Sequence, residues 1–316
     1  MGSSGAPALA NTILDEVSKV ILGKREKLEA ALTALLSDGH VLIEDYPGLA
    51  KTLLAKSFAA ATGLTFKRVQ FTSDLLPADV TGSYILNRNT SKFELREGPV
   101  FTNILLADEI NRAPPRTQSA LLEAMQERQV TIEGDTHKLE EPFWVIATQN
   151  PIEYEGTYPL PEAQLDRFIM RLDVGYPTSS DEAAILSSRD TRGKDDFDVA
   201  PVADKAALQR MRGEVEKVHV DKALQEYMVE IVEATRVHSD VELGASPRGS
   251  LALLKLSKAR TWLKGRDFVL PDDVKAVAVY ALSHRLLLKP ERWMSGVKPT
   301  DVVLGILDKT PVPKVG

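Results

Sequence analysis

The chain has 316 residues, a length that fits two folded domains or one large domain with an appendage. Of these residues 43% are hydrophobic and 27% charged, a composition that excludes disordered and fibrous proteins. It contains no cysteine, which excludes disulfides, thiolate metal sites and cysteine nucleophiles. A net charge of −6 excludes a global attraction to nucleic acid or to an anionic membrane, and the lack of a long apolar run or a basic leader favours a soluble, cytoplasmic protein.

Helical and strand patterns alternate over the first part of the chain. Apolar residues spaced at i, i+4 and i+7 predict amphipathic helices around residues 13–20 and 28–35, and a third helical pattern ends at Gly63. Short apolar segments predict five strands, at residues 41–43, 65–71, 103–107, 143–148 and 169–174. Because helices and strands alternate, we expect an α/β domain with a largely parallel sheet.

Two segments interrupt this alternation. Residues 83–100 hold two strand-like stretches around a turn-forming centre, and residues 129–139 repeat the pattern on a smaller scale. Both predict β-hairpins inserted into the α/β framework. From the pattern alone, each is equally well interpreted as an ordinary surface hairpin.

The composition changes at residues 175–180, the best candidate for a linker. Beyond it we find no convincing strand pattern, while apolar stripes at helical spacing run through residues 224–235 and 252–263. Pro271 can begin a further helix, and the polar residues 190–198 predict a loop. We therefore divide the chain into an α/β domain, residues 1–176, and an all-helical domain, residues 177–316.

A candidate phosphate-binding loop lies between the first predicted strand and the helix that follows it. Residues 43–52 read Ile-Glu-Asp-Tyr-Pro-Gly-Leu-Ala-Lys-Thr. In a loop of this kind backbone N–H groups surround a β-phosphate, Lys51 reaches the β- and γ-oxygens, and Thr52 holds Mg²⁺. Asp45 and Ala50 occupy the two usual glycine positions, so an ordinary strand-to-helix turn with a capping lysine is the alternative. The residues predicted to bind nucleotide are Pro47, Gly48, Leu49, Ala50, Lys51, Thr52 and Leu53.

Three polar residues follow other predicted strands. Asp108 and Glu109 end the strand at 103–107, and Asn150 follows the strand at 143–148. Ligands bind at the carboxyl ends of parallel strands, where Asp108 would hold magnesium and Glu109 would orient and deprotonate an attacking water. Asn150 would hold that water or the γ-phosphate. The alternatives are that the acid pair caps the next helix and that Asn150 forms a turn with Pro151.

A further basic residue lies at a predicted helix start. Ser246 and Pro247 suit the N-cap and the first helical position, which places Arg248 in the opening turn. The side chain would project from a helix end that already attracts anions.

From about residue 20 to residue 288 the chain resembles the MoxR-type ATPases of the AAA+ superfamily. It is similar to the branch that carries an insert in the second core helix and a further hairpin before the first sensor. The matching strings are residues 40–45, 47–52, 108–115, 121–127, 147–151 and 161–168. The resemblance implies an AAA+ P-loop core with a parallel five-stranded sheet and inserted β-hairpins, followed by a helical lid.

The resemblance also implies a mechanism. Such proteins bind ATP and Mg²⁺ between the subunits of a ring, usually a hexamer. Asn150 matches sensor 1, Arg167 matches the arginine finger that reaches the neighbour's γ-phosphate, and Arg248 matches sensor 2, in cis or in trans. A surface ion pair with Asp166 or another acid is the alternative for Arg167.

The hairpins of this branch project toward the central pore, which makes their tips candidate contacts to a client, with subunit packing as the alternative. The tip residues are Asn87, Arg88, Asn89, Lys92 and 133–137. The five histidines show no metal-ligand spacing and are interpreted as structural.

The function implied by the resemblance is Mg²⁺-dependent ATP hydrolysis by a ring that remodels or activates protein complexes, such as metalloenzymes, with a von Willebrand A domain partner. One alternative is an ATP-gated binding ring or adaptor with incidental turnover. Intact Glu109, Asn150 and Arg167 favour hydrolysis. A nucleic-acid motor is a third reading, against which the acidic balance and the lack of an added basic domain weigh.

Overall fold

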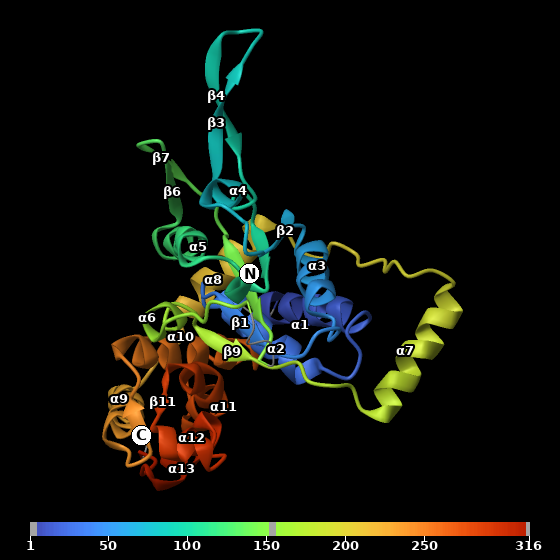
Figure 1. Ribbon diagram of the computed structural model, residues 1–316. Helices are drawn as coiled ribbons and strands as arrows, with labels where there is room; N and C mark the ends of the chain where they lie inside the picture. The colour runs from blue at the N-terminus through green and yellow to red at the C-terminus, as the bar shows by residue number, and fades with distance from the viewer. Residues whose placement is uncertain (1–4, 152–155, 314–316) are drawn as a thin grey trace.

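The structure is a computed structural model that describes residues 5–151 and 156–313 (Figure 1). Five parallel strands form its central sheet, as predicted. In spatial order they are β2 (Phe66–Gln70), β5 (Ile104–Asp108), β8 (Trp144–Gln149), β1 (Val41–Glu44) and β9 (Met170–Leu172). The inner strands are apolar and buried because both faces of the sheet are covered.

Alternate side chains of the strands enter two apolar clusters, one on each face. Val41 and Ile43 pack into a cluster with α1 (Gly5–Ser18), α2 (Arg25–Leu36) and α3 (Lys51–Thr62). Leu42 packs on the opposite face with α5 (Pro115–Glu127). This period-2 alternation fixes which edge residues point to which side of the sheet.

Both predicted hairpins are present. After α4 (Pro77–Thr81), β3 (Gly82–Asn87) and β4 (Lys92–Glu97) form a long antiparallel ribbon that stands away from the body (Figure 1). The second hairpin consists of β6 (Gln129–Ile132) and β7 (Asp135–Lys138). The Tyr84 hydroxyl donates to the Asp135 carboxylate over 2.9 Å, which links the two hairpins.

The C-terminal part is helical, as expected, except for one small sheet. Its helices are α8 (Lys205–Glu216), α9 (Lys222–Val237), α10 (Pro247–Leu263), α11 (Pro271–Leu282), α12 (Pro290–Met294) and α13 (Pro299–Lys309). The prediction of an all-helical domain is wrong at β10 (Val241–Leu243) and β11 (Leu287–Leu288), which pair antiparallel. Strands of three and two residues are too short to leave a period in the sequence.

A helix separates the two parts. The helix is α7 (Ser179–Arg192), which projects from the body and has no buried residue (Figure 1). Its first residues overlap the predicted linker at 175–180, and its last residues overlap the predicted loop at 190–198. The Thr178 hydroxyl caps α7 by accepting from the Asp181 backbone N–H, and Asp181 completes a capping box. The loop predicted at residues 190–198 therefore begins only after α7, at residue 193, and continues to the start of α8 (Lys205–Glu216).

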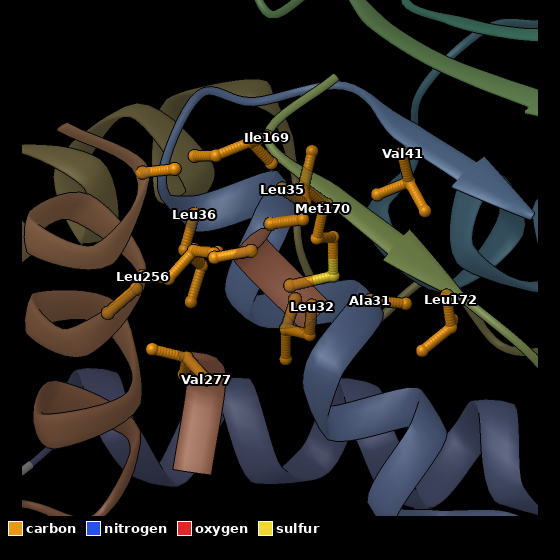
Figure 2. Packing of buried hydrophobic residues seen from close by; sticks show 14 of the residues in the cluster. Ala31, Leu32, Leu35, Leu36, Val41, Ile169, Met170, Leu172, Leu256 and Val277 are labelled. Atoms are coloured by element: carbon orange, nitrogen blue, oxygen red, sulfur yellow. The ribbon is translucent and has the colours of Figure 1, made fainter. Parts of the chain in front are cut away.

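One apolar cluster runs from the α/β part into the helical part. Figure 2 shows Leu32 and Leu36 of α2 and Met170 of β9 gathered with Leu256 of α10 and Val277 of α11. All five side chains are almost completely buried. The division of the chain at residue 176 stays a prediction, because the packing is continuous across it.

Two histidines are buried in the core. The His40 ring accepts from the Val145 backbone N–H at Nδ1, 2.9 Å away, so its Nε2 carries the proton toward the Met125 carbonyl at 3.0 Å. Burial, with a smaller contribution from Arg128, lowers the pKa of His40 to about 3. Burial also lowers the pKa of His284 well below its usual value. Both rings are therefore neutral structural groups.

We predict that acid destabilises the fold through His40. The unfolded chain binds a proton at this residue below about pH 6.5 while the folded chain does not until about pH 3, so stability falls as the pH drops through this window. In the His40→Asn variant, the slope of the free energy of unfolding against pH should be smaller by up to about 1.4 kcal/mol per pH unit. Urea unfolding between pH 7.5 and 5 measures this slope. His219→Asn, at an exposed ring, is the matched control. Equal slopes in wild type and His40→Asn would contradict the prediction.

Candidate active site

A cavity of about 480 Å³ opens at the carboxyl edge of the sheet. It is lined by the loop before α3, by the ends of β2 and β5, and by the residue after β8. The structure thus brings together every residue predicted around the triphosphate except Arg167 and Arg248. The lining residues are Pro47, Gly48, Leu49, Ala50, Lys51, Thr52, Leu53, Arg68, Gln70, Asp108, Glu109 and Asn150.

The backbone around this cavity contains left-handed residues. Gly48 has φ 81°, which a glycine adopts without strain, but Ala50 and Glu109 each have φ 55°. A left-handed conformation at a non-glycine residue costs of the order of 1–3 kcal/mol and is common at functional sites. Ala50 is the N-cap of α3, so the chain turns sharply to expose the N-terminal N–H groups of the helix beside the cavity.

Asp45 explains why the first glycine of the usual pattern is absent. Its carboxylate is buried and accepts from the backbone N–H groups of Val174 and Gly175 at 2.8 and 2.6 Å, and from that of Tyr46 at 2.9 Å. Its carbonyl accepts from Lys51 Nζ at 2.6 Å. A glycine at this position would leave the loop without its attachment to the segment that follows β9.

The carboxylate of Asp108 is held from two sides. Its Oδ1 accepts from the hydroxyl of buried Thr148 at 2.6 Å, and its Oδ2 accepts from Arg68 Nη2 at 2.6 Å and Nε at 3.1 Å. The same Thr148 oxygen accepts from the backbone N–H of Glu109 at 2.8 Å. Thr148 therefore fixes the relative positions of the two acids.

Glu109 is also engaged by neighbouring side chains. Its Oε2 accepts from Gln70 Nε2 at 2.7 Å and lies 3.0 Å from Nε of Arg112, which belongs to the short 3-10 helix η1 (Ile110–Arg112). Both acids are thus oriented into the cavity by hydrogen bonds from β2, β8 and η1.

Sequence reasoning missed Arg68, Gln70 and Thr148. The signal for the first two is the alternation along β2, which puts Arg68 and Gln70 on one face of the strand. The register that places Gln70 opposite Asp108 is visible only in the fold. Thr148 ends the apolar run of β8 beside β5, where its hydroxyl reaches both acids.

The donors in this cavity suit magnesium. The Thr52 hydroxyl and the Asp108 carboxylate are hard oxygen ligands that line the same cavity. Mg²⁺ is usually bound by one or two protein oxygens together with water and substrate phosphates. In the described ranges no group of three His, Cys, Asp or Glu residues could hold a metal ion by itself.

Arg167 and Arg248 lie together in a second cavity of about 450 Å³. Arg167 follows α6 (Glu162–Leu165), and Arg248 is in the first turn of α10, whose N-cap is Ser246 as predicted. Among the residues that the structure describes, Arg167 makes no side-chain hydrogen bond or ion pair, and its Nε is buried. The predicted alternative, an ion pair with Asp166, is therefore absent from the described chain.

The second cavity is strongly basic and contains none of the residues that line the first. Besides Arg167 and Arg248 its charged lining residues are Asp38, Arg128, Asp166, Lys255 and Arg285. Within one chain the two arginines consequently line a different cavity from the loop at residues 47–53.

No helix in the described ranges combines the length and the apolarity needed to cross a membrane.

Comparisons with known proteins give one consistent family. The model of the ATPase family associated with various cellular activities (AAA) matches residues 40–170, and the model of the AAA lid domain matches residues 233–304. A crystal structure of a candidate ATPase from Cytophaga hutchinsonii superposes with a TM-score of 0.91 at 40% identity, over 99% of this chain and 97% of that one.

Relatives along the whole chain agree with this family. Chaperone MoxR1 of Mycobacterium tuberculosis is 42% identical over 99% of this chain and 86% of its own length. An uncharacterized protein of Bacillus subtilis, YeaC, is 48% identical over 96% of this chain and 95% of its own. Protein MoxR of Paracoccus denitrificans is 30% identical over 86% of both chains. The chain therefore belongs to the MoxR-type AAA+ ATPases.

Proposed function

We propose that this protein hydrolyses ATP with Mg²⁺ and uses the turnover to remodel or activate other protein complexes. The single observation that supports hydrolysis best is the shared cavity of the phosphate loop, the acid pair and Asn150. A turn that merely joins a strand to a helix needs neither two strained residues nor two acids held in place by Thr148.

The proposed roles follow from position and chemistry. Backbone N–H groups of residues 47–53 and Lys51 bind the phosphates, and Thr52 and Asp108 hold the metal. When bound, Mg²⁺ neutralises charge on the phosphate oxygens. Glu109 orients and deprotonates the attacking water, and Asn150 holds that water or the γ-phosphate.

We assign Arg167 and Arg248 to the nucleotide of a neighbouring subunit. Both line a cavity that is separate from the phosphate loop of their own subunit, and Arg167 has no anionic partner in the described chain. A buried guanidinium atom without an acceptor fits a group that meets its anion on assembly. This supports a ring of subunits, and the family resemblance favours six.

The hairpins are the proposed contact to the client. Leu86 and Phe93 pair across the β3–β4 ribbon with 54% and 70% of their surface exposed, which is unusual for large apolar side chains and marks a contact surface. The polar tip residues Asn87, Arg88, Asn89 and Lys92 extend it. The relative named Chaperone MoxR1 supports chaperone action, and a von Willebrand A domain partner and a metalloenzyme client rest on the resemblance alone. A cytoplasmic location rests on the composition of the sequence.

The Glu109→Gln variant distinguishes an ATPase from an ATP-gated ring with incidental turnover. We predict that its turnover falls by about 10²–10⁴, because the general base is lost, while its affinity for ATP changes less than about threefold. Phosphate release and binding of a fluorescent nucleotide, each measured over a range of protein concentrations, test this. The Lys51→Ala variant should lose ATP binding as well as turnover. Equal rates in wild type and Glu109→Gln, or no turnover at any concentration, would overturn the enzymatic function.

Arg167→Ala and Arg248→Ala should bind ATP with near wild-type affinity, and Arg167→Ala should lose at least about 10²-fold in turnover. Mixing either variant with Lys51→Ala should restore activity, since the Lys51→Ala subunit contributes intact arginines to its neighbour's nucleotide. Arg210→Ala removes an exposed arginine outside both cavities and serves as the control. Mixtures that stay inactive would contradict action between subunits.

A further inference from the structure

We propose that Arg285 is a positioning residue for hydrolysis: through Asp166 it holds Arg167 and Arg248 in the geometry in which they meet the neighbouring subunit's nucleotide. This inference rests on the proposed function, since it concerns the same two arginines. Arg285 belongs to the 3-10 helix η2 (Ser283–Arg285), which continues α11 of the helical part.

Arg285 binds the backbone on both sides of Arg167. Its Nη2 donates to the carbonyl of Phe168 at 2.7 Å and to that of Asp166 at 3.2 Å, and its Nη1 donates to the carbonyl of Ile169 at 3.3 Å. Only 3% of its side-chain surface is exposed. The carbonyls of the residues before and after Arg167 are thus fixed by one guanidinium from the lid.

This matters because Arg167 has little else to fix it. Within the described ranges its guanidinium has no hydrogen-bonding partner, and its own backbone N–H donates to the Gln164 carbonyl over 3.2 Å. Because no hydrogen bond or ion pair in the described chain fixes the guanidinium, the backbone has a large part in setting the direction of this side chain. Holding residues 166–169 therefore sets where the Arg167 side chain begins.

The carboxylate of Asp166 extends the same contact to Arg248. Its Oδ1 accepts from Arg285 Nε at 2.7 Å, while its Oδ2 accepts from the Ser246 hydroxyl at 2.7 Å and lies 4.0 Å from Arg248 Nη1. Ser246 is also the N-cap of α10 and accepts from the backbone N–H of Arg248. One carboxylate consequently joins the Arg167 segment to the helix start that carries Arg248.

The chemistry of the contact requires an arginine. Only a guanidinium offers five N–H donors in a planar fork, which here reach the Asp166 carboxylate and four carbonyls, three at residues 166, 168 and 169 and one at Ala281. Burial lowers the pKa of Arg285, and the Asp166 carboxylate opposes that shift. A buried ion pair contributes little net stability compared with an apolar pair, so its value lies in fixed geometry. α10 approaches closely at Gly249, where a Cβ atom would lie 3.6 Å from Arg285 Cδ.

Two conservative variants test the proposal. Arg285→Lys keeps the charge but loses the fork, and Asp166→Asn keeps the shape and one acceptor but loses the charge. We expect turnover to fall about 10- to 100-fold in each, because a displacement of about 1 Å in a catalytic group has that effect. ATP affinity should change less than about threefold, since the phosphate loop is untouched. Thermal unfolding confirms that each variant is folded, and if Arg285→Lys fails to fold, Asp166→Asn carries the test.

Mixed rings separate positioning from general damage. Arg285→Lys mixed with an equal amount of Lys51→Ala should regain activity at about a quarter of the interfaces, where the intact arginines of Lys51→Ala face an intact phosphate loop. The matched control replaces Lys51→Ala with the double variant Lys51→Ala/Arg285→Lys, which has no intact arginines to contribute and should restore nothing.

The outcomes also distinguish the two proposals. The positioning role is overturned, and the proposed function stands, in either of two cases. In the first, Lys51→Ala restores the turnover of Arg167→Ala but not that of Arg285→Lys and Asp166→Asn. In the second, Arg285→Lys and Asp166→Asn both retain wild-type turnover. If Arg167→Ala itself is not restored, action between subunits fails, and the role of Arg285 fails with it.

Discussion

The negative charge of a triphosphate has to be met by cations during hydrolysis, and this chain distributes its cations between two separate cavities. Lys51 lines one, with the metal-binding candidates Thr52 and Asp108, while Arg167 and Arg248 line the other. In the function proposed here, hydrolysis needs both sets of cations around one triphosphate. An assembly of subunits would meet this need by bringing the second cavity of one subunit to the first cavity of its neighbour.

Two carboxylates support this division, that of Asp45, which is buried, and that of Asp166, which is partly buried. Asp45 attaches the phosphate loop to the segment after β9, and Asp166 attaches the segment before β9 to the helical part. Both are paired with N–H or guanidinium donors, which offset the cost of removing a carboxylate from water. The two cavities are therefore connected through the same short edge strand, and the positions of their cations are related by a rigid piece of backbone.

The sequence predicted the parallel sheet, both hairpins and the first cavity, because apolar periods and strand ends are local patterns. It did not predict that Arg68 and Gln70 contact the two acids, because that contact depends on the register between β2 and β5. It did not predict the β10–β11 pair, because strands of three and two residues are too short to show a periodic pattern. It did not predict the location of Arg248, because that depends on how α10 packs against the α/β part, a contact between residues far apart in the sequence.

The apolar cluster that continues from α2 and β9 into α10 and α11 has a mechanical consequence. Swinging the lid away from the core would expose apolar surface at about 25 cal/mol per Å², so one subunit behaves as a single stiff block. In the proposed assembly, motion during a turnover cycle would then occur at the contacts between subunits and in the projecting ribbon. Conformational change would then spread through the assembly as rotations of whole subunits, and the β3–β4 ribbon of each subunit would move with them.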